Sequence, residues 1–130
     1  MDLNKLTRNS IPGILCGIII MILTLLPGSL FPRVKPTIGL DKLAHIFMYA
    51  GFTFSCLWGY RSHFISNGIA YKKRAILLAI IISLAYGGLT ELIQEYLVST
   101  RTGDLFDYIA DCIGTGLGAL LFYVFFRRKK

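Results

Sequence analysis

Charged side chains are scarce in this chain of 130 residues. Only 16% of the residues are Asp, Glu, Lys or Arg, 55% are hydrophobic, and the mean hydropathy is +0.63. Soluble domains average about 25% charged residues, so this composition excludes an ordinary soluble domain. It also excludes a disordered chain, because so many apolar residues would not stay solvated.

Cysteine is scarce as well, and Cys16, Cys56 and Cys112 lie far apart within apolar runs. An odd, scattered set excludes a disulfide-stapled secreted scaffold, and we expect the three to be small packing residues. Only seven acidic residues oppose 14 basic ones, which gives a net charge of +7. The basic residues lie between and after long apolar segments, so they indicate membrane topology, and we expect no nucleic-acid partner.

Four long apolar segments predict an all-α bundle of four transmembrane helices, with residues 1–130 as a single domain in a lipid bilayer. The first segment, residues 11–31, carries no charge and is long enough to cross about 30 Å of hydrocarbon. It lacks a small-x-small cleavage site, which favours an uncleaved span over a signal peptide. The other spans are expected at 43–60, 75–96 and 105–126, with a plain loop between the second and third.

Lysine and arginine residues are distributed unequally between the two sides of the predicted bundle. Ten of the 14 lie in the amino-terminal segment, the second connection and the tail, and four lie in the first and third connections. Because positive charge favours the cytoplasmic side, we expect both termini to be cytoplasmic.

The other polar side chains gather toward the outer ends of the last three spans. At about 1.5 Å of rise per residue, His45, Glu91 and Asp111 each lie about 24 to 26 Å from the inner basic residue of their own span. An ionised group at mid-membrane costs on the order of 3 kcal/mol, so these three should face one another around water or a ligand. One turn further out, at i,i+4 spacing, lies a second layer of Asp41, Glu95 and Asp107.

The deeper layer supplies the candidate catalytic residues, His45, Glu91 and Asp111. Gly114 and Gly118 continue the Asp111 face as a GxxxG step, which favours close approach of a second helix. The candidate ligand-binding residues around the deeper layer are Asp41, Lys42, Gln94, Glu95, Arg101, Asp104 and Asp107.

Simpler structural roles are alternatives for several of these acids. Asp104 and Asp41 are each suited to N-cap a helix, and Asp107 would then favour the helix dipole from the first turn. Asp111 lies too deep for capping. Glu95 has the alternative of an interfacial ion pair.

A bound cation is another alternative for the cluster. His45 and the surrounding carboxylates are suited to a divalent cation of the hard kind. Zinc fits less well, because the outer half offers one histidine and no cysteine. Tyr49 extends the His45 face, and we expect it to be a core residue.

The order and spacing of these motifs resemble the VanZ-like family of small bacterial membrane proteins, over about residues 38–122. The resemblance implies a protein of the bacterial cytoplasmic membrane, in a family whose named member is linked to glycopeptide (teicoplanin) resistance. The matching motifs are Asp41-Lys42-Leu43-Ala44-His45, Glu91-Leu92-Ile93-Gln94 and Arg101-x-x-Asp104-x-x-Asp107-x-x-x-Asp111.

We therefore expect an outward-facing pocket that engages a component of the cell envelope, such as a lipid-linked or cell-wall precursor, with Arg101 and Lys42 on its anionic groups. The alternative is a membrane-embedded hydrolase or transferase acting on a lipid headgroup. In that case Glu91 or Asp111 would be the general base and His45 the acid. Ion or proton passage ranks below both, because we expect no polar groups in the inner halves of the spans.

Overall fold

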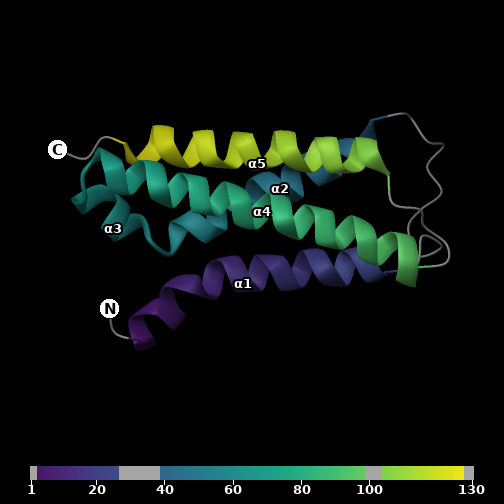
Figure 1. The fold of residues 1–130 in the computed structure, drawn as a ribbon, viewed down its shortest axis with the longest axis horizontal. Coiled ribbons are helices and arrows are strands. Elements are labelled where there is room, and N and C mark those ends of the chain that lie inside the picture. Colours follow the sequence, from purple (N-terminus) through teal and green to yellow (C-terminus); the bar gives the residue numbers. More distant parts are fainter. Residues whose placement is uncertain (1–2, 27–38, 99–103, 128–130) are drawn as a thin grey trace.

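The described part of the chain is built from helices that run side by side. In the computed structural model, residues 3–26, 39–98 and 104–127 are described, and all regular structure within them is helical, which confirms the all-α prediction. α1 begins and α5 ends at the same end of the bundle (Figure 1). The helices are α1 (Leu3–Leu25), α2 (Leu40–Trp58), α3 (Arg61–Ser66), α4 (Ile69–Leu97) and α5 (Leu105–Phe126).

Three of these helices are long and apolar enough to cross a membrane. They are the Thr7–Leu25 part of α1, α4 and α5. Their outward faces carry exposed large apolar side chains, such as Ile18 and Leu121, which suits contact with lipid. α2 has 19 residues but is not among the three, because Asp41, Lys42 and His45 lie in its first two turns. Three of the four expected spans are thus supported, and α2 as a fourth span stays a prediction.

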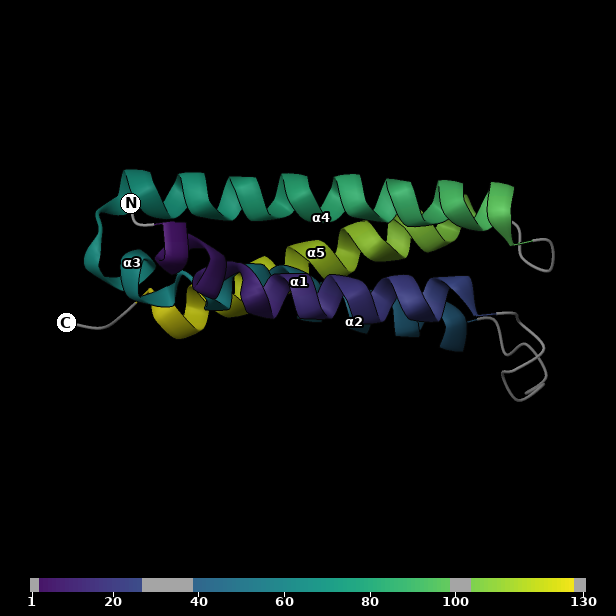
Figure 2. The same cartoon turned by 90° about the horizontal axis from the view of Figure 1, so that it is seen from below.

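The closest helix pair is α2 against α5, and it depends on glycine. A Cβ at Gly114 would collide with the carbonyl oxygen of Ile46, and one at Gly118 would collide with that of Ala50. Gly114 and Gly118 are four residues apart, and so are Ile46 and Ala50, so the two backbones are in contact along one line. This confirms the close approach predicted from the GxxxG step. α1 packs on the other side of the bundle, against α2 and α4 (Figures 1 and 2).

The expected plain loop between the second and third spans is wrong. Residues 61–66 form the short helix α3, and α4 begins at Ile69, before the basic residues of that connection. The reason is Phe64, which is buried against the ring of Phe122 with 5.0 Å between ring centroids. An aromatic anchor of this kind fixes the connection to the bundle.

Phe64 belongs to an aromatic core at the end of the bundle where α3 lies. Its buried members are Leu57, Phe64, Ala79 and Phe122, with Phe54 and Phe126 packed around them. Phe122 is fully buried. Its ring centroid lies 4.7 Å from that of Phe126 and 5.5 Å from that of Phe54. All three cysteines are free, as expected for packing residues.

Candidate functional site

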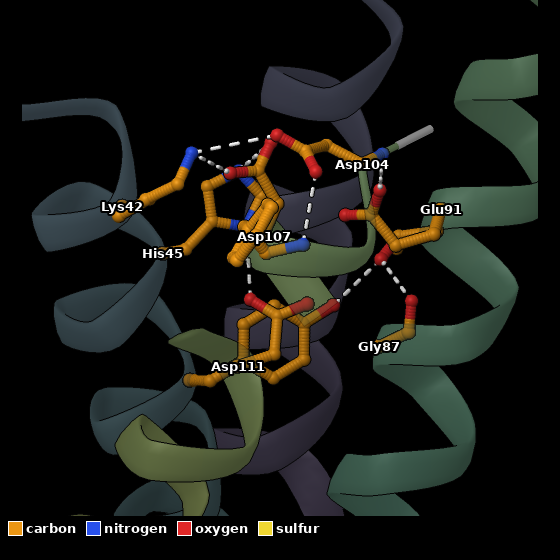
Figure 3. Close-up of polar contacts among 10 residues, drawn as sticks. Lys42, His45, Gly87, Glu91, Asp104, Asp107 and Asp111 are labelled. Atoms are coloured by element: carbon orange, nitrogen blue, oxygen red, sulfur yellow. Dashed lines mark hydrogen bonds and ion pairs between the residues drawn. The ribbon is translucent and has the colours of Figure 1, made fainter. Parts of the chain in front are cut away.

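The candidate site lies at the end of the bundle opposite the aromatic core. The amino-terminal turns of α2 and α5 and the carboxyl-terminal turns of α4 meet there (Figure 1). α2 and α5 run parallel to each other and α4 runs antiparallel to both, so residues far apart in sequence come to one level, as helical rise predicts (Figure 1). Figure 3 shows side chains from all three helices converging.

A buried histidine–aspartate pair is at the centre of the site. His45 Nδ1 lies 2.8 Å from Asp111 Oδ1, a hydrogen bond between α2 and α5 (Figure 3). Asp111 is fully buried and His45 nearly so. Gly87 on α4 allows this depth, since a Cβ there would lie only 3.2 Å from Asp111 Oδ2.

An ion-paired group lies above this pair, nearer the end of the bundle. Lys42 Nζ is 3.2 Å from Asp107 Oδ1 and 3.4 Å from Asp104 Oδ2. Asp107 is buried, and its Oδ2 is 3.9 Å from His45 Nε2. His45 therefore lies between two aspartates of α5 that are one helical turn apart.

Asp104 is the N-cap of α5, as one alternative predicted. Its side chain accepts a 2.9 Å hydrogen bond from the backbone N–H of Phe106. That hydrogen bond, and then the neighbouring Lys42, lower the pKa of the Asp104 carboxyl below its usual value. The corresponding alternative for Asp41 is wrong, because Gly39 is the N-cap of α2 and Asp41 lies in its first turn.

Glu91 connects α4 to the site. Its Oε2 accepts a 3.0 Å hydrogen bond from the backbone N–H of Asp104 (Figure 3). Its other oxygen, Oε1, is buried and has no hydrogen-bond partner among the described residues, and the same holds for Asp111 Oδ2. His45, Glu91 and Asp111 each offer an atom within 4.8 Å of the others. The predicted deep layer thus exists as a cluster, which we call the acid–histidine cluster.

The predicted outer layer does not exist as a unit. Asp107 is buried beside the acid–histidine cluster, whereas Asp41 and Glu95 are exposed. Gln94 is buried on α4, one turn from Thr90. Arg101 lies outside the described residues.

Sequence reasoning missed a set of buried hydroxyls that continues inward from the cluster. The Tyr49 hydroxyl lies 2.7 Å from Thr90 Oγ1, and Thr53 Oγ1 donates to Ser83 Oγ at 2.8 Å. Thr115 is buried too, and its hydroxyl has no partner in the described part of the chain. Tyr49 is buried as expected, yet it is also a polar link between α2 and α4.

We expected no polar groups in the inner halves of the spans. That expectation is wrong, because these buried hydroxyls extend from the cluster to the middle of the bundle. A four-residue repeat could have revealed them. It runs through His45, Tyr49 and Thr53 on α2 and through Asp111 and Thr115 on α5, and residues at this spacing share a helix face.

Two clefts in the structure lie away from the cluster. One, of about 440 Å³, is bordered by α1, α2 and α4 and includes Gly17, Phe52 and Tyr86. The other, of about 470 Å³, lies beside Leu57 and Arg74. Both are mainly apolar and neither includes a residue of the acid–histidine cluster, so the predicted ligand pocket does not coincide with either.

The fold and site define a class of protein: a helical membrane protein with a buried acid–histidine cluster at one end. The chain belongs to the VanZ/LLP1 family, which matches residues 10–126. The chain is also 31% identical over 90 residues to the uncharacterised protein C11E3.10 of Schizosaccharomyces pombe. That match covers 68% of this chain, which spans about half the length of the relative. No solved structure matches the chain.

Family membership confirms the resemblance drawn from the motifs, and it supports a VanZ-type membrane protein. Because C11E3.10 comes from a fungus, family membership alone does not fix a bacterial source. Residues 10–38 also belong to the matched region, so α1 is part of the family's domain, in addition to the motif-bearing helices.

Proposed function

We propose that the acid–histidine cluster is the floor of an outward-facing site that binds an anionic or hydroxyl-bearing component of the cell envelope. The observation that carries the proposal is the burial of Asp111 against His45. A buried pair of ionisable groups is a poor way to stabilise a fold, because desolvation offsets most of the attraction between them. Ionisable side chains within membrane-spanning helices are costly and concentrate at functional sites.

In this proposal Lys42 and Arg101 contact the anionic part of the ligand, and the carboxylates and His45 orient its hydroxyl or amine groups. Asp41 and Glu95 are exposed and are given no contact with the ligand. The ligand class is a lipid-linked or cell-wall precursor in a bacterial cytoplasmic membrane, and a contribution to teicoplanin resistance is one consequence.

The proposal also includes the membrane topology. Both termini lie in the cytoplasm, and α2 is the fourth span.

A membrane-embedded hydrolase or transferase is the second candidate, and the Asp111–His45 hydrogen bond favours it. In such an enzyme His45 moves the proton and Asp111 or Glu91 is the base or the group that orients it. Turnover of a lipid phosphate or lipid-linked precursor by the purified protein separates an enzyme from a binding protein.

Topology and phenotype test the proposal together. Cysteine labelling in intact cells should find position 67 cytoplasmic and position 101 external, and the reverse result would move the site to the cytoplasm. In a bacterial strain lacking its own copy of the gene, expression of the chain should lower teicoplanin susceptibility, and Asp111→Asn should abolish that effect. An unchanged effect in Asp111→Asn would contradict the proposed site.

A further inference from the structure

We propose that His45, Glu91 and Asp111 bind one divalent cation of the manganese type. The inference rests on the proposed function and deepens it, since the cation would be the group that the anionic ligand meets at the floor of the site. It takes up the bound cation that the sequence left open as an alternative for this cluster.

Convergence is the first observation. Each of the three side chains offers one donor atom, and the three atoms lie within 4.8 Å of one another (Figure 3). Metal–ligand bonds of about 2.0 to 2.2 Å place two opposite ligands about 4 Å apart. The donors come from α2, α4 and α5, so small side-chain rotations close them around an ion without moving a helix.

The unpartnered oxygens are a second and independent observation. Asp111 is fully buried. Its Oδ1 is hydrogen-bonded to His45, and its Oδ2 has no hydrogen-bond partner among the described residues. Glu91 repeats the pattern, with Oε2 bonded to the backbone of Asp104 and Oε1 buried and unpartnered. Buried polar atoms normally have partners, and a lone carboxylate oxygen is costly to bury. A cation between these two carboxylates would satisfy both.

Charge points the same way. Within the described residues, Lys42 pairs with Asp104 and Asp107, and no lysine or arginine pairs with Glu91 or Asp111. Among the described residues, the imidazole of His45 is therefore the only potential cation beside the two deep carboxylates, and one protonated ring cannot neutralise both. A divalent ion would.

The donor set selects the kind of ion. Carboxylate oxygens suit manganese, and an imidazole nitrogen beside them suits a transition metal better than calcium or magnesium, which take oxygen ligands. One nitrogen and two carboxylates leave coordination positions open, as in metal sites that also hold a substrate oxygen. Asp107, 3.9 Å from His45, is placed to orient the ring.

Manganese binding to the purified full-length chain tests the inference directly. The protein is stripped with a chelator in detergent, Mn²⁺ is titrated in, and free Mn²⁺ is followed by electron paramagnetic resonance. We expect one Mn²⁺ per chain, displaced by Zn²⁺. His45→Gln, Glu91→Gln and Asp111→Asn should each weaken binding by more than about tenfold, since even outer partners of a metal site are worth about 10- to 100-fold.

Matched controls separate ligation from loss of fold. His63→Gln removes the other histidine, on α3 at the opposite end of the bundle, and Glu95→Gln removes an exposed acid one turn from Glu91. Both should bind Mn²⁺ as the wild type does. Each variant is checked for helical content and a single size-exclusion peak, and the wild-type titration is decisive even where a variant does not fold.

No saturable Mn²⁺ binding to the wild type, or equal loss in the two controls, would overturn the cation site. That result would leave the proposed function standing if Asp111→Asn still abolished the teicoplanin phenotype. Conversely, tight Mn²⁺ binding with a silent Asp111→Asn phenotype would support the metal site and contradict the proposed envelope function.

Discussion

The two ends of the bundle hold their helices together by different chemistry. At the α3 end, α2, α3 and α5 meet through aromatic rings, and Phe122 is fully buried among them. At the opposite end the same α2 and α5 meet through His45, Asp107 and Asp111. The aromatic end demonstrates that these helices can be packed without buried charge. Since buried charge is a weak and expensive way to join helices, packing alone does not account for the polar end, whereas the proposed function does.

A glycine seam joins the two ends and gives the largest expected effect. Gly114→Val places a branched side chain against the backbone of Ile46 and forces α2 away from α5. Overpacking of a tight core costs about 1 to 3 kcal/mol, and here a backbone must move, so we expect a loss of about 3 kcal/mol or more in unfolding free energy. Unfolding in mixed detergent micelles measures it.

Gly116→Val is the control, because a Cβ there meets nothing within 4 Å. It makes the same chemical change on the same helix. Similar losses in the two variants would mean that helix propensity, and not the α2–α5 contact, decides the outcome.

The aromatic end should respond to truncation in stability alone. Phe122→Ala leaves a cavity between Phe54, Phe64 and Phe126, and we expect a loss of about 3 kcal/mol, the lower end for buried phenylalanine. Phe125→Ala on the exposed face should change the unfolding free energy little. Phe122→Ala protein that still folds should keep the envelope phenotype. Loss of that phenotype at a normal protein level would contradict the claim that the aromatic end contributes to stability alone.

The polar end should respond in the opposite way. Asp111→Asn and Glu91→Gln keep the shape of the side chain and most hydrogen bonds, so we expect unfolding free energies within about 1 kcal/mol of the wild type. Function should nevertheless be lost, as measured by susceptibility at matched protein levels in the membrane. If both variants instead accumulated to a much lower level in the membrane, the result would show that Glu91 and Asp111 mainly stabilise the fold.

The difference between the ends was only partly visible in the sequence. Helical rise alone placed His45, Glu91 and Asp111 at one level, because straight helices that lie side by side keep their register over this distance. The same argument failed for Asp41 and Glu95, because both lie close to a helix end, where sharing a face with a buried residue does not by itself bury a side chain. Asp107 differs from them because α5 turns it toward Lys42 and His45.

Contacts between different helices were the other feature that the sequence did not predict. The aromatic anchor Phe64 fixed α3 where a plain loop was expected, since its partner Phe122 is 58 positions away in the sequence. The hydroxyl links Tyr49–Thr90 and Thr53–Ser83 likewise join different helices. Periodicity reveals which residues share a face, but only the fold reveals which faces meet.

The smallest expected effect concerns the rim of the polar end, where Asp104 caps α5. Its carboxyl pKa is lowered from an ordinary value of 3.8 by the Phe106 N–H and by Lys42. A lowered folded-state pKa means that the charged form stabilises the fold above the unfolded-state pKa, and that this contribution is lost as the pH falls through the folded-state pKa. Asparagine caps a helix about as well but carries no charge, so Asp104→Asn isolates the charge-dependent part.

We therefore expect a small stability advantage of the wild type over Asp104→Asn at pH 7, which shrinks below pH 4 and vanishes in stronger acid. Thermal unfolding of both proteins in detergent, measured in parallel across this range, gives the difference directly and cancels every other titrating group. Added salt should reduce the advantage as well, because Lys42 and Asp104 are both partly exposed. A difference that stays constant from pH 7 to pH 3 would show that the Asp104 charge does not stabilise the start of α5.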